Sequence, residues 1–261
     1  MLRSAHAVVH RQYSREDSFM QLRDRVAVIT GASKGLGREI ARLYAARGAT
    51  LVLVARGAPD LQKAADEIRG VTDVLAIPAD VGEDAEQIAQ AALDRFGRVD
   101  ILINNASDIG PSPMPALDAY PWDALLRVLR INAVAPLHLI QLLAPRMKDR
   151  GAGVILNVTS DAGVNSYPGW GGYGASKAAL EHLSRTLAVE LEATGIRVYI
   201  VDPGDMNTEM HRRAEPGADL THLPGPEVPA PAFVRLVEDE GLPPGRYEAM
   251  KLITMPHVGV R

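Results

Sequence analysis

The stretch that decides the fold is VAVIT-GASKGLG-REIARLYAAR, residues 26–47. A β-branched run at 26–30 passes through a turn with three glycines and continues as a helical pattern over 38–47. Glycine lets the backbone turn tightly and approach a phosphate closely, and the free N–H groups at a helix N-terminus favour an anion. The stretch therefore predicts a strand, a dinucleotide-binding turn and a helix, and the alternative is an ordinary glycine-rich loop. The residues expected to contact the cofactor here are Gly31, Ser33, Lys34, Gly35, Leu36 and Gly37.

The rest of the chain repeats this alternation. Further strand-like runs lie at 50–55, 73–79, 100–104, 153–159, 196–201 and near 246–250, and helical patterns lie at 83–97, 121–150, 173–193 and 232–240. Strands that alternate with helices predict an α/β fold with a doubly wound parallel sheet of the Rossmann type, a three-layer αβα sandwich. Because no repeat or linker divides the chain, we expect one domain over 21–261. Its segment 205–231, rich in proline, glycine and charge, is expected to form a substrate lid.

Composition excludes several classes of function. The 261 residues carry a net charge of −4 with both signs mixed, so we expect no nucleic-acid partner. The absence of cysteine excludes disulfides, thiolate metal sites and a cysteine nucleophile. His138, His211 and His222 lack further ligands at suitable spacing, so we expect no metal site. Since no apolar run reaches the roughly 20 residues that cross a bilayer, we expect a soluble protein with no membrane partner.

Residues 1–20 lack the apolar core of a secretory signal. Arg3, Arg11 and Arg15 precede the first acid, Glu16, which is a composition shared with mitochondrial transit peptides. We prefer a disordered N-terminal tail on a cytoplasmic protein, and the mitochondrial alternative stays open. Either Met1 or Met20 is the working start.

The second predicted strand ends in Ala55-Arg56. NAD-binding folds usually carry an acid at this point for the ribose hydroxyls, whereas a guanidinium can hold a 2′-phosphate through two N–H donors. Arg56 therefore favours NADP(H) over NAD(H), and Lys34 adds charge on the same side. The alternative is that Arg56 is a solvated loop residue.

Polar and small residues follow the other strands where these end: Asp80-Val81, Asn104-Asn105-Ala106-Ser107, Ser160 and Asp202-Pro203-Gly204. Ligands of open parallel sheets bind at this edge, so these residues are candidates for a site. The loop 108–120 is stiffened by prolines, and the loop 161–172 carries Tyr167, Pro168 and Trp170. Each loop is either a pocket wall or a plain structural connection.

Tyr173 and Lys177 are four residues apart at the start of a helical pattern, so they lie on one helix face. A cation beside a phenol favours the phenolate, which suggests proton chemistry, and the alternative is an ordinary surface pair. Earlier in the chain, Asn132 lies in an apolar stretch just before Pro136. A bend in the helical region is expected there, because asparagine is a poor helix former and proline removes a donor.

Several motifs occur together and in order: TGxxxGxG at 30–37, Asn-Asn-Ala at 104–106, Asn132, Ser160, Tyr-x-x-x-Lys at 173–177, and Pro-Gly at 203–204 with Thr208. In these motifs the chain resembles the short-chain dehydrogenase/reductase family over about 25–208. The resemblance implies that Tyr173 exchanges a proton with the substrate oxygen and that Ser160 stabilises that oxygen. It also implies that Lys177 lowers the tyrosine pKa and holds the nicotinamide ribose, and that Asn132 positions a water relay behind the lysine.

The resemblance also implies further cofactor contacts. Asp80 and Val81 would meet the adenine, and Asn104 and Ala106 the ribose side. Pro203, Gly204 and Thr208 would meet the nicotinamide end. Two features depart from the family. Ser107 replaces a usual glycine and would narrow the space beside the nicotinamide. The C-terminal sequence GRYEA at 245–249 replaces the common ending, which puts a tetramer built through the last strand in doubt. We expect a homodimer through the long helices, or a homotetramer.

These residues predict an oxidoreductase that transfers a hydride between NADP(H) and a small to medium ketone, aldehyde or secondary alcohol. The alternative is a catalytically silent NADP(H)-binding module that senses redox state, which the intact set of Asn132, Ser160, Tyr173 and Lys177 argues against. A sugar-nucleotide epimerase or dehydratase fits less well, because the chain is short and its glycine spacing differs.

Overall fold

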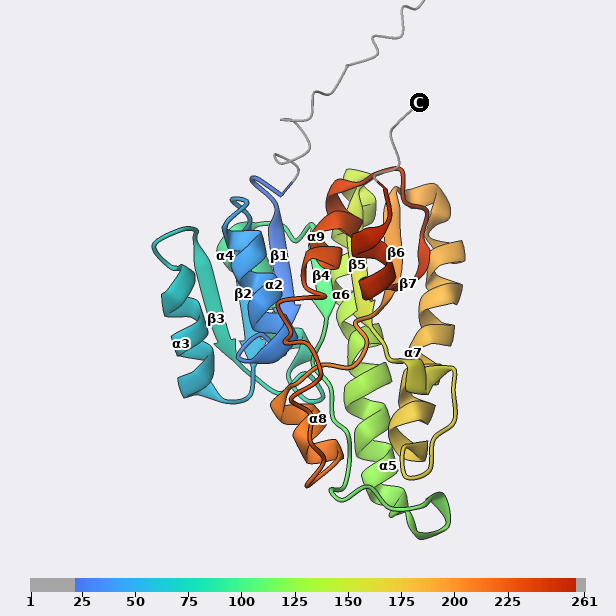
Figure 1. Cartoon of the computed structure of the whole chain (residues 1–261). Helices are drawn as coiled ribbons and strands as arrows, with labels where there is room; N and C mark the ends of the chain where they lie inside the picture. The colour runs from blue at the N-terminus through green and yellow to red at the C-terminus, as the bar shows by residue number, and fades with distance from the viewer. Residues whose placement is uncertain (1–21, 257–261) are drawn as a thin grey trace, which may run out of the picture.

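The computed structural model describes residues 22–256. Within them, seven parallel strands form one sheet in the order β3-β2-β1-β4-β5-β6-β7 (Figure 1). The strands are β1 (Val26–Thr30), β2 (Thr50–Ala55), β3 (Val74–Pro78), β4 (Ile101–Asn104), β5 (Gly153–Val158), β6 (Ile196–Asp202) and β7 (Gly245–Glu248). The doubly wound parallel sheet predicted from the sequence is confirmed. The predictions on the N-terminal tail concern residues 1–20 and lie outside the described residues.

Helices cover both faces of the sheet and give the three-layer sandwich (Figure 1). Alternate strand residues point to opposite faces, so Ala27 and Ile29 of β1 pack with one helical layer while Val26 and Val28 pack with the other. The first layer holds α2 (Gly35–Ala45), α3 (Ala58–Ile68), α9 (Pro231–Glu238) and α10 (Ala249–Thr254). The second holds α4 (Ala85–Phe96), α6 (Ala135–Arg150) and the C-terminal part of α7 (Gly171–Glu190). Every residue of β1 and β5 is buried, which explains their continuous apolar sequences.

The glycine turn after β1 is fixed by the loop that follows β4. The Thr30 hydroxyl accepts the backbone N–H groups of Asn105 and Ala106, both at 3.0 Å. The Asn105 side-chain amide in turn donates to the carbonyl of Thr30 at 2.9 Å. Gly31 has a φ of +66°, and a Cβ there would come within 2.7 Å of the Asn105 amide nitrogen. Glycine is therefore required by conformation and by space.

The helical region predicted over 121–150 is interrupted where Asn132 and Pro136 suggested. It consists of α5 (Trp122–Leu129), a π-helical turn (Arg130–Val134) and α6. A π-helical turn displaces the hydrogen-bond ladder by one residue, which lets Asn132 point into the interior and leaves room for Pro136. By length and composition the stretch 122–150 is able to cross a bilayer. However, 56% of its apolar window is buried in the protein, as in a core helix.

The chain end differs from the sequence prediction. The last predicted strand stops at Glu248, and the residues after it form α10, which packs against α9. The buried Arg235 of α9 donates to the carbonyls of Leu252, Met255 and Pro256, each at 2.6 Å. This guanidinium satisfies orphan carbonyls at the C-terminus of α10.

Helix α5 and the short α8 (Glu209–Ala214) lie beyond the carboxyl ends of the strands (Figure 1). Helix α8 lies within the predicted lid segment 205–231. The Ser112 hydroxyl donates to the carbonyl of Arg213 at 2.6 Å, which joins the proline-rich loop to α8. The site described next lies beneath these elements.

Candidate active site

Tyr173 and Lys177 both lie in the first half of α7 and are both buried, with exposed fractions of 8% and 2%. The Lys177 ammonium donates to the carbonyl of Val158 at 2.9 Å, at the end of β5. It lies 5.4 Å from the centre of the Tyr173 ring. The interpretation as a surface pair is therefore wrong, because both side chains point into the protein at the carboxyl edge of the sheet.

Burial shifts the two pKa values in opposite directions. It lowers the pKa of Lys177 to about 8, because the ammonium is largely removed from water, and the charge of Asp202 partly opposes this. Burial raises the pKa of Tyr173 above its ordinary value, while hydrogen bonding by Ser107 and Ser160 lowers it. The sequence suggested a tyrosine pKa lowered by its lysine neighbour. In the structure the desolvation of the phenolate is the larger effect, so Tyr173 keeps its proton at neutral pH.

Ser160 follows β5 after Thr159 and caps the N-terminus of the 3-10 turn Asp161–Gly163. Its hydroxyl accepts the backbone N–H of Ala162 at 3.2 Å and donates to the Asp161 carboxylate at 3.1 Å. A hydroxyl has a single proton to donate, so a substrate oxygen at this site would have to replace Asp161 as the acceptor. Asp161 also accepts the Tyr167 hydroxyl at 2.6 Å, which keeps the carboxylate partnered when Ser160 turns away.

Asn132 is 1% exposed, and protein groups fill all four hydrogen-bonding positions of its side chain. Its oxygen accepts the Asp108 N–H at 2.7 Å and the Ser107 hydroxyl at 3.2 Å. Its nitrogen donates to the Asp108 carbonyl and to the Ser176 hydroxyl, each at 2.8 Å. The side chain therefore has no position left for the water relay expected from the sequence. Instead it joins the π-helical turn to the loop after β4 and to α7.

Ser107 is a site residue whose role the sequence did not predict. It replaces a glycine of the family pattern, which suggested only a narrower space. In the structure its hydroxyl donates to the Asn132 side-chain oxygen at 3.2 Å, and hydrogen bonding by Ser107 lowers the pKa of Tyr173. The departure from the family pattern was the signal, but only the fold shows which groups the serine meets.

An apolar cluster covers the catalytic face of α7. Tyr173 packs with Ile109, Ala162 and Ala214, and Met114, Trp170 and Met210 lie against this group. The Trp170 ring meets the Tyr173 ring edge to face at 5.7 Å and the His211 ring at 6.2 Å. These residues come from the loop after β4, the loop before α7, and α8. Trp170 was a predicted pocket residue, and the methionines of the cluster were missed.

The glycine turn fits a nucleotide pyrophosphate. No side chain caps the N-terminus of α2 and no acid occupies its first turn, so the first N–H groups are free to bind an anion. A Cβ on Gly37 would lie 2.4 Å from the Gly31 carbonyl oxygen. A Cβ on Gly35 would meet only a methyl group of Thr208, at 3.8 Å, so the turn is open on that side. Ser33 and Leu36 lie in the same turn, where Leu36 is buried in the core.

The two cations predicted to bind a 2′-phosphate are exposed, and both lie next to carboxylates. The Lys34 ammonium is 3.1 Å from Asp60 and 3.0 Å from Glu209. The Arg56 guanidinium is 3.8 Å from Asp80 and is 62% exposed. Arg56 and Asp80 border a hollow of about 400 Å³ that Arg127, Arg130 and Ile131 also line. A phosphate here would compete with exposed, solvent-screened ion pairs.

The other predicted cofactor residues gather along the same edge. Val81 is buried behind Asp80, whose carboxylate accepts the N–H of Gly82 at 2.9 Å. Asn104 donates to Asn157 at 2.8 Å, and within the described part of the chain its oxygen is buried without a partner. Ala106 is held through its backbone by Thr30. Pro203 and Gly204 follow β6, and Thr208 caps α8 through the His211 N–H at 3.3 Å.

Among residues 22–256 no group of three or more histidine, aspartate or glutamate side chains is placed to hold a metal ion. His138 is partly exposed and lies 3.3 Å from Glu86, so it is neither a core residue nor part of the site. His211 packs against Trp170 above the catalytic face, and its ring lies 3.7 Å from the Glu215 carboxylate.

This combination defines a nucleotide-dependent oxidoreductase with a single-sheet Rossmann-type scaffold, and comparison with known proteins identifies the family. The profile of the short chain dehydrogenase family matches residues 25–219. The chain is also 37% identical to 7alpha-hydroxysteroid dehydrogenase from Escherichia coli over 195 residues. This alignment covers 73% of this chain and 74% of that protein. The protein therefore belongs to the short-chain dehydrogenase/reductase family.

Solved structures agree with this assignment. A short chain dehydrogenase from Shigella flexneri complexed with NADP superposes with a TM-score of 0.79 at 29% identity, covering 88% of this chain and 98% of that one. A 7 alpha-hydroxysteroid dehydrogenase complexed with NADH and 7-oxo glycochenodeoxycholic acid superposes with a TM-score of 0.80 at 30% identity, covering 89% and 95%. The shared property of these relatives is a nicotinamide cofactor. The family match ends at residue 219, so β7, α9 and α10 lie beyond it.

Proposed function

We propose that the protein reduces a small to medium, partly apolar ketone or aldehyde with NADPH, or oxidises the corresponding secondary alcohol. The observation that carries the proposal is the buried Tyr173–Lys177 pair at the carboxyl edge of the sheet, with Ser160 at the end of the neighbouring strand. The apolar cluster around Tyr173 supports a substrate whose body is apolar and whose carbonyl is its reactive polar group.

Tyr173 acts as the general acid in the reducing direction. Because burial keeps the phenol protonated, the free protein is ready to donate a proton to the substrate oxygen at neutral pH. Ser160 turns its hydroxyl from Asp161 to the same oxygen and stabilises the negative charge that develops there. In the oxidising direction Tyr173 must lose its proton first, so alcohol oxidation is favoured at alkaline pH.

Lys177 supplies a positive charge 5.4 Å from the centre of the Tyr173 ring, and in this proposal it also holds the hydroxyls of the nicotinamide ribose. When bound, the nicotinamide cofactor supplies or accepts the hydride. Asn132 and Ser107 hold the loop after β4 against α7, so that the phenol keeps its orientation. The apolar cluster excludes water from the reacting atoms.

The test is the oxidation of NADPH, followed by absorbance, with a panel of ketones and aldehydes of graded size. The wild-type protein should turn over part of the panel, and Tyr173→Phe should lower kcat about 100-fold or more while NADPH still binds. Tyr247→Phe removes a phenol whose hydroxyl donates to the Pro243 carbonyl, away from the site, and is the matched control, expected to keep most activity. Tight NADPH binding without turnover on the whole panel would refute the enzyme and favour a redox-sensing module.

We also propose that NADP(H) is preferred over NAD(H). Arg56 and Lys34 support this, because they are exposed cations at the end of β2 and at the glycine turn, and Ala55 stands where an acid would select NAD(H). Arg56→Ala and Ala55→Asp should each lower the ratio of kcat/KM for NADPH to that for NADH by about tenfold. An unchanged ratio in both variants would refute the preference.

A homo-oligomer through α5 and α7 is part of the proposal. Large apolar side chains are exposed on these helices and on the turn between α5 and α6, namely Trp122 at 75%, Leu126 at 58%, Val134 at 55% and Val189 at 74%. Light scattering of the purified protein should give at least a dimer, and Trp122→Glu with Val189→Glu should shift the mass toward the monomer. A monomeric wild type would refute this assembly.

A further inference from the structure

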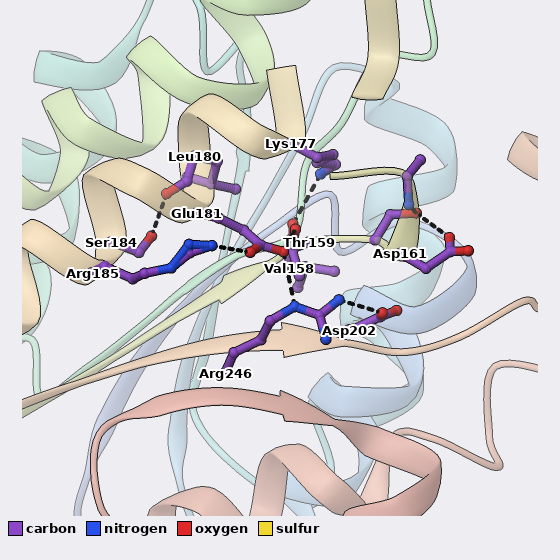
Figure 2. A network of polar contacts seen from close by, with 12 residues as sticks. Val158, Thr159, Asp161, Lys177, Leu180, Glu181, Ser184, Arg185, Asp202 and Arg246 are labelled. Carbon is purple, nitrogen blue, oxygen red and sulfur yellow. Dashed lines mark hydrogen bonds and ion pairs between the residues drawn. The ribbon is translucent and has the colours of Figure 1, made fainter. Parts of the chain in front are cut away.

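Arg246 lies on β7, beyond the family match, yet it reaches the catalytic helix. Its guanidinium donates to Glu181 at 3.0 Å through Nε and to Asp202 at 2.7 Å through Nη2 (Figure 2). Glu181 lies one helical turn after Lys177 on α7, and Asp202 is the last residue of β6. One side chain of the C-terminal strand therefore joins the catalytic helix to the turn that precedes Pro203 and Gly204.

Both carboxylates are buried, with exposed fractions of 0% for Glu181 and 5% for Asp202. Glu181 also accepts the Thr159 hydroxyl at 2.9 Å and the Arg185 guanidinium at 2.6 Å, so it retains partners without Arg246. The other oxygen of Asp202 accepts the backbone N–H of Gly204 at 3.0 Å. Within the described residues, Arg246 is the only cation paired with Asp202. A buried carboxylate needs such a partner to stay charged.

The charge of Asp202 is felt in the active site, where it raises the pKa values of both Lys177 and Tyr173. Burial raises the pKa of Asp202 itself, and the Gly204 N–H and Arg246 lower it. Arg246 thus favours the ionised form of Asp202, and its positive charge opposes the negative field that Asp202 exerts on the catalytic pair.

We infer that Arg246 is a positioning residue that ties the C-terminal strand to the active site, holding the Asp202–Gly204 turn through Asp202 and offsetting the Asp202 charge at Lys177 and Tyr173. The inference rests on the proposed function, because that function assigns the Asp202–Gly204 turn to the nicotinamide end of the cofactor and assigns Tyr173 and Lys177 to proton transfer. The charged and titratable groups around the pair are Asp161 after β5, Glu181 and Arg185 on α7, Asp202 on β6, Arg246 on β7, and His211 on α8, which meets Trp170.

The first test uses the cofactor-free protein, so it does not depend on turnover. The pKa of Lys177 is measured by NMR titration of its ε-carbon in the wild type and in two variants. Arg246→Gln removes the cation beside Asp202 but not the carboxylate, so the Lys177 pKa should rise by about half a unit to one unit wherever Asp202 stays ionised, and the Asp202 carboxyl carbon is followed in the same titration. Asp202→Asn removes the negative field, so the same pKa should fall below the wild-type value. Shifts of opposite sign are not expected from loosened packing alone.

Arg185→Gln is the matched control, because it removes a guanidinium from Glu181 without touching Asp202. It should leave the Lys177 titration within about 0.2 units of the wild type, since Arg185 is half exposed and screened by solvent. If Arg246→Gln does not fold, Arg246→Lys replaces it, and the inference then requires NADPH to bind this variant more weakly than the wild type. A Lys177 pKa that does not fall in Asp202→Asn, or that does not rise in a folded Arg246→Gln with Asp202 ionised, overturns the inference.

The second test measures whether Arg246 holds the Asp202–Gly204 turn in the conformation that binds NADPH. Arg246→Gln should weaken NADPH binding, followed by nicotinamide fluorescence, by about three- to tenfold, because the Asp202 carboxylate that fixes Gly204 loses its partner. Arg246→Lys keeps the charge but only one of the two contacts, and should recover the Lys177 titration while recovering NADPH affinity in part. If the wild type turns over no substrate of the panel, the proposed function is refuted, while the measured shifts of the Lys177 pKa remain valid. NADPH affinity unchanged in Arg246→Gln would refute the role of Arg246 at the turn.

Discussion

Replacing Lys177 with methionine should stabilise the folded protein at neutral pH although it removes a catalytic group. The pKa of this lysine falls from 10.5 to about 8 on folding because the ammonium is buried. That difference corresponds to about 3 kcal/mol of free energy of unfolding that the charged lysine costs the wild type. Methionine has a similar length and carries no charge, so the variant does not carry this cost.

The sign of the pH dependence follows from proton binding. Below pH 8 the lysine is protonated in both states, and the full cost is present. Between pH 8 and 10.5 the unfolded chain binds more protons than the folded one, so the wild type gains stability as the pH rises. Above 10.5 the cost has vanished. The methionine variant also leaves the Val158 carbonyl without its donor, which costs about 1 to 2 kcal/mol at every pH.

Together, the two effects predict that the free energies of unfolding of the wild type and of Lys177→Met become equal at a pH between 7 and 10.5. Lys177→Met should be more stable than the wild type by about 1 to 2 kcal/mol at pH 7 and less stable by a similar amount near pH 10.5. Urea unfolding followed by circular dichroism, at half-unit steps of pH, measures the difference, in which the titrations shared by both proteins cancel. Lys148→Met, at an exposed position of α6, is the control and should show no such slope. A difference that stays flat from pH 7 to 10.5 would refute the argument from burial.

Two further predictions concern the frame of the site. Gly37→Ala should lower NADPH affinity at least tenfold and lower the urea midpoint of unfolding, because the added Cβ would lie 2.4 Å from a backbone oxygen. Gly57→Ala should change neither quantity, because among the described residues no atom lies within 4 Å of the Cβ that it adds. Equal affinities in the two variants would contradict the steric argument. Asn132→Ala should lower the free energy of unfolding by about 2 to 4 kcal/mol, since four buried hydrogen bonds are lost. Asn165 is exposed, so Asn165→Ala should change the free energy of unfolding by less than about 0.5 kcal/mol. A loss below 1 kcal/mol for Asn132→Ala would mean that water replaces these contacts.

The inner strands of the sheet were predictable because they are buried on both faces and their sequences are largely apolar, as in VAVIT and GVILNV. The glycine turn and the helix break at Asn132 were predictable because glycine, asparagine and proline impose local backbone conformations. Helix α10 was missed since AMKLIT is six residues long, too short to show a helical period. Its position is set by tertiary contacts with α9 and by the Arg235 side chain.

The contacts that complete the site could not be predicted, because they join residues far apart in the sequence. Arg246 and Glu181 are separated by 65 positions, and Ser107 and Asn132 by 25. Nothing in the local sequence of GRYEA indicates that its arginine meets two buried carboxylates. Spacing along a helix places Tyr173 and Lys177 on one face, but it carries no information about what covers that face.

The apolar residues packed around Tyr173 decide the protonation of Tyr173 and Lys177. Spacing alone suggests that a lysine beside a tyrosine lowers the phenol pKa, and this would hold for an exposed pair, where the Coulomb attraction acts and desolvation is small. Met114, Trp170 and Met210 close over the tyrosine and reverse the outcome, since the same apolar environment that destabilises the phenolate also destabilises the ammonium. In the free protein the pair therefore consists of a protonated phenol and an ammonium that loses its proton near pH 8. Whatever makes the phenolate accessible for alcohol oxidation has to add positive charge or remove negative charge close to the phenol, and Arg246 already acts in that direction from the C-terminal strand.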